Sequence, residues 1–346
     1  MSTSHSRIKR VTQSDVAAMA GVSTAVVSAV TSSRPGKTIR VGKDAEKRVR
    51  AAMETLGYAP NVVAQSLAGG KRNIIGVFTY EAIFPSDSEN FFYPFLLGIE
   101  RGAMTLGQDL LLFTSSSLEQ GPRSIFPNGA NRMGVADGAI LLGEEPDKRE
   151  LKQLYDTGFP FVTIGRRDPE DADVNWVAAD YVTAVADVVE RCTELGHRKL
   201  KFVGARNVRE QNIDRETGFL QQQGSGLELS VERLAAEEID ANWLARCLED
   251  GNTVVLTETF RHAVALERQV LAQHGTVPDT ISIVALAAPL NRSADVERWT
   301  RISVPREEMG ELAVRNLISQ ISSPDNAAIK ATLPCGLVPG STLKNN

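Results

Sequence analysis

The stretch "SDVAAMAGVSTAVVSAV" (Ser14–Val30) contains two short runs of apolar residues at helical spacing, joined by a single glycine, Gly21. The first run follows Thr12, an N-cap residue type, with Asp15 three residues on as in a capping box. Ser23 is a suitable N-cap for the second run. The apolar positions at helical spacing are Val16, Ala20, Val26, Val27 and Val30. The stretch predicts two short helices around a glycine turn.

A third helix is expected over residues 43–56, after the permissive cap position Gly42. Between the second and third helices lies a polar loop with the turn Pro35-Gly36. Two short helices joined by a turn with glycine are the arrangement of a DNA-binding helix-turn-helix. Gly21 allows a positive φ or a close helix approach, and the small side chains around it let the second helix enter a groove about 12 Å wide.

Charge divides the chain into a basic start and an acidic remainder. Residues 1–72 hold 12 Lys and Arg and 4 acids, a net charge of +8, whereas the whole chain carries −5. The remainder therefore carries −13. This asymmetry indicates a basic module that meets a polyanion, attached to a body that does not.

From residue 73 onward, short β-rich runs alternate with helical stretches. Near-continuous apolar runs of this kind are typical of parallel strands covered on both faces. The expected strands are residues 74–79, 110–114, 138–142, 160–164, 200–204, 253–257 and 281–286. The length of this βαβ pattern favours two doubly wound subdomains.

The 346 residues favour two or three compact units. No run of about 18 apolar residues suits a membrane span, and the basic first residues lack the apolar core of a signal peptide, so we expect a cytoplasmic protein. Cys192, Cys247 and Cys335 have neither disulfide-framework nor zinc-site spacing and are expected to be packed, reduced thiols.

An ordered series of motifs resembles the LacI/GalR family of bacterial transcriptional repressors along essentially the whole chain. The motifs are "DVAAMAGVSTAVVSAV", "RVRAAMETLGYAPNVVAQSLAGGKRNIIGV", "DGAILL", "ELGHRKLKFVG", "DRETGF" and "ISVPREEMGELAVRNL". The resemblance implies an N-terminal all-α helix-turn-helix headpiece (1–60), a hinge helix and linker (61–72) and an α/β effector domain (73–346). The effector domain would have two doubly wound subdomains, be periplasmic-binding-protein-like, dimerise and bind a small molecule.

The resemblance also assigns residues of the second helix to DNA. Thr24, Ala25 and Val26 fall where the family reads base edges in the major groove. Ser23, Ser28 and Thr12 suit phosphate contacts, which fix register without reading sequence. Family members often have an arginine where this chain has Ala29, so a guanine contact is absent. Ala29 would read a thymine methyl, or the loop with Arg34, Lys37 and Arg40 would compensate; a solvated surface is the alternative for these loop charges.

"PNVVAQSLAGG" resembles the hinge helix, which is too short to be stable alone. Val63, Ala64 and Leu67 would share one face of this helix. In the family this face enters the minor groove, where the leucine separates a central base step and kinks the duplex. An ordinary core role for Leu67 is the alternative.

Candidate effector-binding residues come from the resemblance and from their place after strands. By the resemblance, Arg215 in "DRETGF" would bind ligand hydroxyls, and Asp180 in "WVAAD" is a second candidate. Phe91 and Phe92, with Phe84 as a weaker candidate, follow the first strand, where ligand-lining side chains are common. Core packing is the alternative for the phenylalanines, and a salt bridge is the alternative for Arg215.

Two departures from the family concern the ligand. Thr259-Phe260 stands where the family usually has Asn-Asp, and Ala287-Ala288 stands where it often has Asp-Asp. A hexose bound there would leave hydroxyls without acceptors. If Phe260 faces the cleft, the pocket suits a ligand with a flat or apolar part and an acidic end. An ordinary sugar, or a pocket that has lost its ligand, are the alternatives.

The sequence shows no catalytic constellation. The four histidines are scattered, His197 in "LGHRK" is expected to be a structural turn residue, and no nucleophile elbow, P-loop or metal cluster is present. We therefore expect a homodimeric, ligand-responsive repressor without a cofactor or metal. Its partners would be operator DNA, a small-molecule effector and a second copy of itself, and no membrane. The rivals are a sugar-binding receptor, which the basic headpiece disfavours, and an enzyme on the same scaffold.

Overall fold

The structure, a computed structural model, describes residues 11–31, 41–59, 72–81, 91–114, 123–143, 147–224, 226–287 and 296–346. The chain divides into two compact units, Met1–Asn73 and Ile74–Asn346. Except for Arg72, the expected hinge and linker over residues 61–72 lie outside the described residues. Within the described part of the chain, no single helix is long and apolar enough to cross a membrane.

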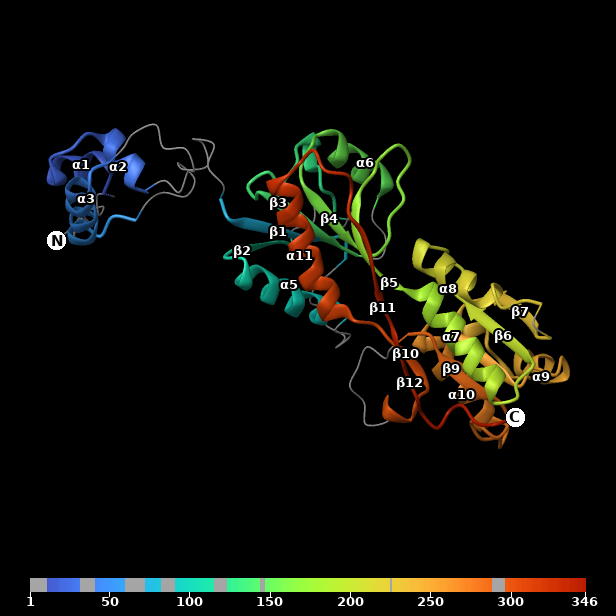
Figure 1. The fold of residues 1–346 in the computed structure, drawn as a ribbon. Coiled ribbons are helices and arrows are strands. Elements are labelled where there is room, and N and C mark those ends of the chain that lie inside the picture. Colours follow the sequence, from blue (N-terminus) through green and yellow to red (C-terminus); the bar gives the residue numbers. More distant parts are fainter. Residues whose placement is uncertain are drawn as a thin grey trace, which may run out of the picture. The chain divides into compact units, whose positions relative to one another are not determined.

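The first unit, the headpiece, contains the helices α1 (Gln13–Ala20), α2 (Thr24–Thr31) and α3 (Lys43–Leu56), drawn in blue in Figure 1. The expected start of α1 is confirmed, because the Thr12 side chain accepts from the Asp15 N–H and the Asp15 carboxylate accepts from the Thr12 N–H. Apolar side chains of all three helices form one small core. Its buried members are Val16, Ala17, Ala20, Val27, Val49 and Ala52.

Gly21 ends α1 in the left-handed region, with φ of 62°. A Cβ at this position would lie 3.2 Å from Nη1 of Arg48, which donates to the Ala20 carbonyl at 2.7 Å. Both expected reasons for a glycine, a positive φ and a close approach, are therefore present at this turn.

The second unit contains two six-stranded sheets, each in its own lobe (Figure 1). The first lobe has the strand order β11-β5-β4-β3-β1-β2, and all its neighbouring strands are parallel. Its strands are β1 (Ile74–Thr79), β2 (Asp109–Phe113), β3 (Gly138–Leu142), β4 (Phe161–Ile164), β5 (Asn175–Asp180) and β11 (Lys330–Pro334). Its helices are α5 (Tyr93–Thr105), α6 (Lys148–Asp156), α11 (Arg306–Ser322) and the 3₁₀ turn η1 (Pro127–Gly129).

The second lobe has the order β12-β10-β9-β8-β6-β7, parallel except for the antiparallel pair of β12 and β10. Its strands are β6 (Lys199–Gly204), β7 (Glu228–Arg233), β8 (Val254–Thr257), β9 (Ser282–Ala285), β10 (Arg301–Ser303) and β12 (Gly336–Val338). Its helices are α7 (Tyr181–Glu194), α8 (Glu210–Leu220), α9 (Ala241–Glu249), α10 (Phe260–Ala272) and the 3₁₀ turns η2 (Ala236–Glu238) and η3 (Val296–Arg298).

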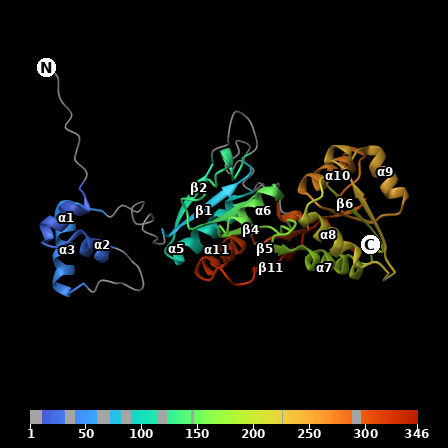
Figure 2. The ribbon, with the colours of Figure 1, turned by 90° about the horizontal axis from the view of Figure 1, so that it is seen from above.

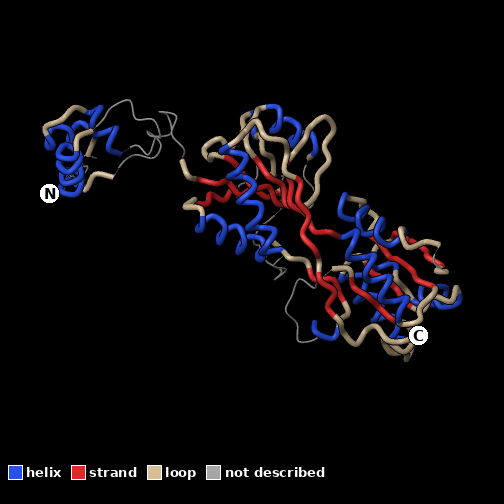
Figure 3. The backbone as a smooth tube through the Cα atoms, in the orientation of Figure 1, coloured by secondary structure: helices blue, strands red, loops and turns tan. Residues whose placement is uncertain are grey.

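Each sheet has a hydrophobic core on both faces, as near-continuous apolar strands require. In the first lobe, side chains of α5 and α11 cover one face and side chains of α6 the other. In the second lobe, α7 and α8 cover one face and α9 and α10 the other. Figure 3 shows these strands in red with helices in blue around them, and Figure 2 shows the same layers from above. The expected fold class, a helical headpiece with two doubly wound α/β subdomains, is confirmed.

The chain crosses between the lobes where β5 leads into α7, where β10 leads into α11, and where β11 leads into β12. These crossings place the start of α7 and the start of α11 next to the carboxyl ends of the first lobe's strands. Ligands of open α/β sheets bind at such carboxyl ends, so a ligand pocket is expected at this edge of the first sheet.

Candidate functional site

The headpiece has the geometry of a helix-turn-helix. The axes of α1 and α2 are bent by 106° across the turn Gly21–Ser23. Helix-turn-helix units join two helices at roughly 90–120° through a turn of about three or four residues, often with glycine. The bond from Arg48 of α3 to the Ala20 carbonyl fixes the end of α1. Val26, Val27 and Val30 of α2 pack into the core formed with α1 and α3, which holds the second helix at this angle.

The face of α2 that points away from the headpiece core carries small polar and apolar side chains. Thr24, Ala25 and Ser28 are exposed, whereas Val27 is fully buried. Val26 is partly buried and packs against the core. Residues at the N-terminal end of a recognition helix contact base edges, so Thr24 and Ala25 are placed for that role, and Val26 is less accessible.

The N-cap side chains of the headpiece already have partners within the protein. The Ser23 hydroxyl accepts from the Val26 N–H at 3.4 Å, and the Thr12 hydroxyl donates to the Asp15 carboxylate at 2.7 Å. Ala29 is partly buried on α2. Roles for these residues in DNA contacts remain predictions. Arg34, Val63, Ala64 and Leu67 lie outside the described residues, as do Lys37, Arg40 and Phe84.

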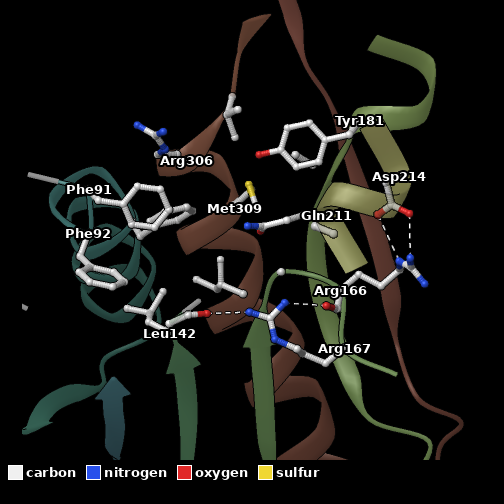
Figure 4. A pocket seen from close by; sticks show the side chains of 17 residues that line it. Phe91, Phe92, Leu142, Arg166, Arg167, Tyr181, Gln211, Asp214, Arg306 and Met309 are labelled. Atoms are coloured by element: carbon white, nitrogen blue, oxygen red, sulfur yellow. Dashed lines mark hydrogen bonds and ion pairs between the residues drawn. The ribbon is translucent and has the colours of Figure 1, made fainter. Parts of the chain in front are cut away.

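The second unit contains a pocket between the lobes, at the carboxyl ends of β3, β4 and β5 (Figure 4). We call it the interlobe pocket. Its apolar lining comes from Phe91, Phe92, Phe95, Leu142, Ile164, Ala178, Ala179, Val304 and Met309. Its polar lining comes from Arg166, Arg167, Tyr181, Gln211, Asp214 and Arg306, with Gly143 and Gly165 at the strand ends. The cavity measures about 50 Å³. Sites for small molecules measure roughly 300–1,000 Å³, so side chains fill most of this pocket and a ligand requires it to open.

Arg166, just after β4, joins the two lobes. Its Nη2 and Nε donate to the two carboxylate oxygens of Asp214 on α8 at 2.8 and 3.2 Å, and its Nη1 pairs with Asp168. Burial works to lower the pKa of Arg166, but the bonds and charges of Asp214 and Asp168 outweigh it and raise that pKa. Both Asp214 oxygens are therefore occupied by an arginine of the protein itself.

Arg167 is buried and satisfies its guanidinium with backbone oxygens. It donates to the carbonyl of Gly143 at 2.6 Å and to that of Arg166 at 2.7 Å, as Figure 4 shows. Burial lowers its pKa, although Glu210 acts in the opposite direction. Arg167 therefore ties the loops after β3 and β4 together at the floor of the pocket.

Arg306, the first residue of α11, is a partly buried cation against aromatic rings. Its guanidinium carbon lies 4.9 Å from the centre of the Phe91 ring and 6.0 Å from that of Phe95. Burial lowers its pKa, Tyr181 acts in the opposite direction, and the like charge of Arg215 lowers the pKa further. Within the described part of the chain, its guanidinium has neither a carboxylate partner nor a hydrogen-bond acceptor.

The close packing of α11 on α5 fixes the position of Arg306. A Cβ on Gly98 of α5 would lie 1.8 Å from the Glu307 carbonyl oxygen, and a Cβ on Gly310 would lie 2.4 Å from the Phe95 carbonyl oxygen. Glycine at both positions lets the helix backbones touch. The start of α11 is consequently held beside Phe91 and Phe95.

The predicted effector residues divide between the pocket and its surroundings. Phe91 and Phe92 line the interlobe pocket. Arg215 lies behind Tyr181, with its guanidinium carbon 3.6 Å from the ring centre, and donates to the carbonyls of Leu286 and Gln211. Asp180 caps α7 by accepting from the Thr183 N–H at 3.1 Å.

Phe260 packs away from the pocket. Its ring centre lies 5.2 Å from that of Trp299, against the core between α9, α10 and the second sheet. Thr259 is the N-cap of α10 and accepts from the His262 N–H. This geometry favours core packing for Phe260, and a ligand role for Phe260 finds no support in it.

None of the six polar residues that line the pocket was predicted as a binding residue: Arg166, Arg167, Tyr181, Gln211, Asp214 and Arg306. A signal exists for two of them, because the pair Arg166-Arg167 follows directly after an expected parallel strand. Arg306 stands in the motif "ISVPREEMGELAVRNL", which was quoted for the family resemblance and assigned no ligand role.

Comparisons with known protein families identify the kind of domain in each of the two units. Residues 12–61 match the family "Bacterial regulatory proteins, lacI family", and residues 189–343 match "Periplasmic binding protein-like domain". The chain thus combines a LacI-family DNA-binding domain with a periplasmic-binding-protein-like domain, and its homologues are LacI/GalR transcriptional regulators.

Individual relatives agree with this class. The chain is 29% identical over 193 residues to catabolite control protein A of Priestia megaterium, covering 56% of this chain and 54% of that relative. It is 24% identical over 333 residues to the probable transcriptional repressor ExuR of Bacillus subtilis, covering 92% of this chain and 94% of that one. The structure of the lac repressor dimer bound to operator and the anti-inducer ONPF has a TM-score of 0.67 at 21% identity, covering 96% and 99% of the two chains. At 21% identity, the similarity to the lac repressor structure shows a shared fold.

Proposed function

We propose that this protein is a ligand-responsive transcriptional repressor that binds a near-palindromic operator as a homodimer. The observation that carries the proposal is the helix-turn-helix bend of 106°, with Thr24, Ala25 and Ser28 exposed on α2. The net charge of +8 in residues 1–72 supports the same partner, because DNA binding is dominated by phosphate contacts.

The second unit supplies the ligand response. The interlobe pocket lies between lobes that the chain crosses repeatedly, so a ligand that opens it changes how the lobes pack. The relative CelR has been solved as a complex with cellobiose, which supports a small-molecule effector for this chain. If effector and operator prefer different arrangements of the dimer, each changes the affinity of the other by the same factor. In the hinge, Val63, Ala64 and Leu67 are proposed to enter the minor groove.

The proposal is tested by selecting duplexes from a random-sequence DNA library with the full chain. We expect enrichment of a sequence with two-fold symmetry. A variant with a carboxylate on the exposed face of α2, Ala25→Asp, is expected to lose this enrichment, because it places a negative charge against the duplex. Thr55→Asp on α3 is a matched control, since it adds the same charge to another exposed position of the headpiece. Failure of the wild-type chain to enrich any sequence would contradict the proposal.

A further inference from the structure

The cation Arg306 is not explained by the fold. Its guanidinium lies in the wall of the interlobe pocket, stacked on Phe91, and has no acceptor among the described residues. A structural arginine recovers hydrogen-bond energy through an ion pair or a carbonyl, whereas the Arg306 guanidinium is left to aromatic rings and solvent. Arg166 and Arg167, in the same pocket, do recover it in these ways.

The acids near the pocket are already engaged. Asp214, the carboxylate in the described lining, binds Arg166 with both oxygens. Glu210 on the same helix pairs with Lys148 at 2.8 Å. Among the described residues, the lining therefore holds three arginines against one occupied carboxylate, so this part of the lining carries a net positive charge.

We infer that the effector is a small organic anion whose carboxylate or phosphate group binds the Arg306 guanidinium and whose flat apolar part lies against Phe91. The inference rests on the proposed regulatory function, for which it names the ligand class. Guanidinium binds both carboxylate and phosphate through paired charge-assisted hydrogen bonds.

The rest of the lining agrees with this ligand class. Phe91 and Phe92 meet edge to face at 5.2 Å, and Met309 adds a further apolar surface. A neutral hexose needs several acceptors for its hydroxyls, and the free side-chain amide of the described lining is that of Gln211. Apolar walls with one cation suit a ligand that has a ring and an acidic group.

The test uses ligands in pairs that differ in charge. Glucuronate and glucose 6-phosphate are each compared with glucose, benzoate is compared with benzamide, and phenyl phosphate is compared with phenol. Binding to the full chain is measured by calorimetry and by the shift in melting temperature. At least one anion is expected to bind more tightly than its neutral partner. The carboxylate and phosphate compounds distinguish the two kinds of acidic group.

Variants then locate the anion. Arg306→Gln is expected to weaken binding of that anion at least about tenfold, because it removes charge-assisted hydrogen bonds. Arg315→Gln removes the same charge from the exposed side of α11 and is expected to bind like wild type. The inference is wrong if no anion binds better than its neutral partner, or if Arg306→Gln binds the anion as tightly as wild type.

A second measurement needs no ligand. Arg306→Met keeps an apolar stem against Phe91 and removes a charge without a partner, so its melting temperature is expected to equal or exceed that of wild type. A clear fall would show that Arg306 serves the fold, and would overturn the inference. Neither assay contains DNA, so loss of operator binding would contradict the proposed function and leave this result standing.

Discussion

The guanidinium of Arg166 binds both carboxylate oxygens of Asp214, and this pair joins the first lobe to helix α8 of the second lobe. The two side chains are 26% and 19% exposed, so water screens the pair only in part. Lys148 and Glu210 form a second link between α6 and α8. The arrangement of the lobes around the interlobe pocket therefore depends on ion pairs that end on one helix.

Asp214→Asn is expected to destabilise the second unit by about 1.5–3 kcal/mol, since hydrogen bonds to a charged group are lost in a half-buried place. Asp156→Asn is the control, because it breaks the exposed pair with Lys152 and is expected to cost about 0.5 kcal/mol. Urea unfolding of the full chain, followed by tryptophan fluorescence, measures both. Equal losses in the two variants would contradict a structural role for the interlobe pair.

Gly21→Ala is expected to destabilise the headpiece more than Gly57→Ala does. Both glycines have a positive φ, of 62° and 63°, and alanine in this region costs about 1–2 kcal/mol. A Cβ at Gly21 would also press on Arg48, whereas one at Gly57 meets nothing within 4 Å. Amide hydrogen exchange in α1 and α3 of the full chain measures the loss. Equal protection in the two variants would show that the Arg48 side chain moves aside without a loss of headpiece stability.

Local sequence signals predicted the headpiece and most strands of the lobes. The capping box at Thr12 and the glycine at Gly21 are local features, so they could be read without the fold. The seven predicted strands correspond to β1, β2, β3, β4, β6, β8 and β9, with ends that differ by a residue at most. Buried central strands carry continuous apolar runs, and this makes them visible in a sequence.

Five strands were not predicted. One of them, β5 (Asn175–Asp180), is a buried internal strand of the first sheet, and the other four are polar, short or at sheet edges. β7 (Glu228–Arg233) alternates polar and apolar residues at the edge of the second sheet. β12 has three residues, and its pairing with β10 depends on the crossing of the chain between lobes. Such strands are set by tertiary contacts and not by local pattern.

The interlobe pocket could be predicted only in part. Phe91 and Phe92 were found from their place after a strand, but Arg306 reaches the pocket because glycines let α11 touch α5. Phe260 was a candidate ligand contact because Thr259-Phe260 stands where the family usually has Asn-Asp, but its ring packs on Trp299. The direction of a side chain at a helix start depends on packing that the sequence does not display.

Acidification below pH 6.5 is expected to destabilise the second unit through two buried histidines. Nε2 of His197 donates to the Lys344 carbonyl at 3.0 Å, and Nε2 of His262 donates to the Leu234 carbonyl at 3.0 Å. Burial lowers the pKa of both rings. Because the histidine pKa is lower in the folded chain than in the unfolded chain, the unfolded chain binds protons at a higher pH as the solution is acidified. The contribution of these histidines to the free energy of unfolding is therefore complete above about pH 6.5 and decreases below it.

The histidine prediction is checked by urea unfolding at pH 7.5 and pH 5.5. His197→Gln keeps a donor for the Lys344 carbonyl and removes one titrating group, so it is expected to lose less stability between the two pH values than wild type. An equal loss in wild type and variant would show that His197 does not contribute to the pH dependence.

The salt dependence of operator affinity tests the central claim, that the headpiece of this protein binds DNA, most directly. The selected duplex is titrated with the full chain at a series of salt concentrations, and binding is followed by fluorescence anisotropy. If the two headpieces of a dimer neutralise about 6–10 phosphates, affinity falls by roughly 10³–10⁵ between 50 and 200 mM salt. An affinity that barely changes over this range would contradict the account.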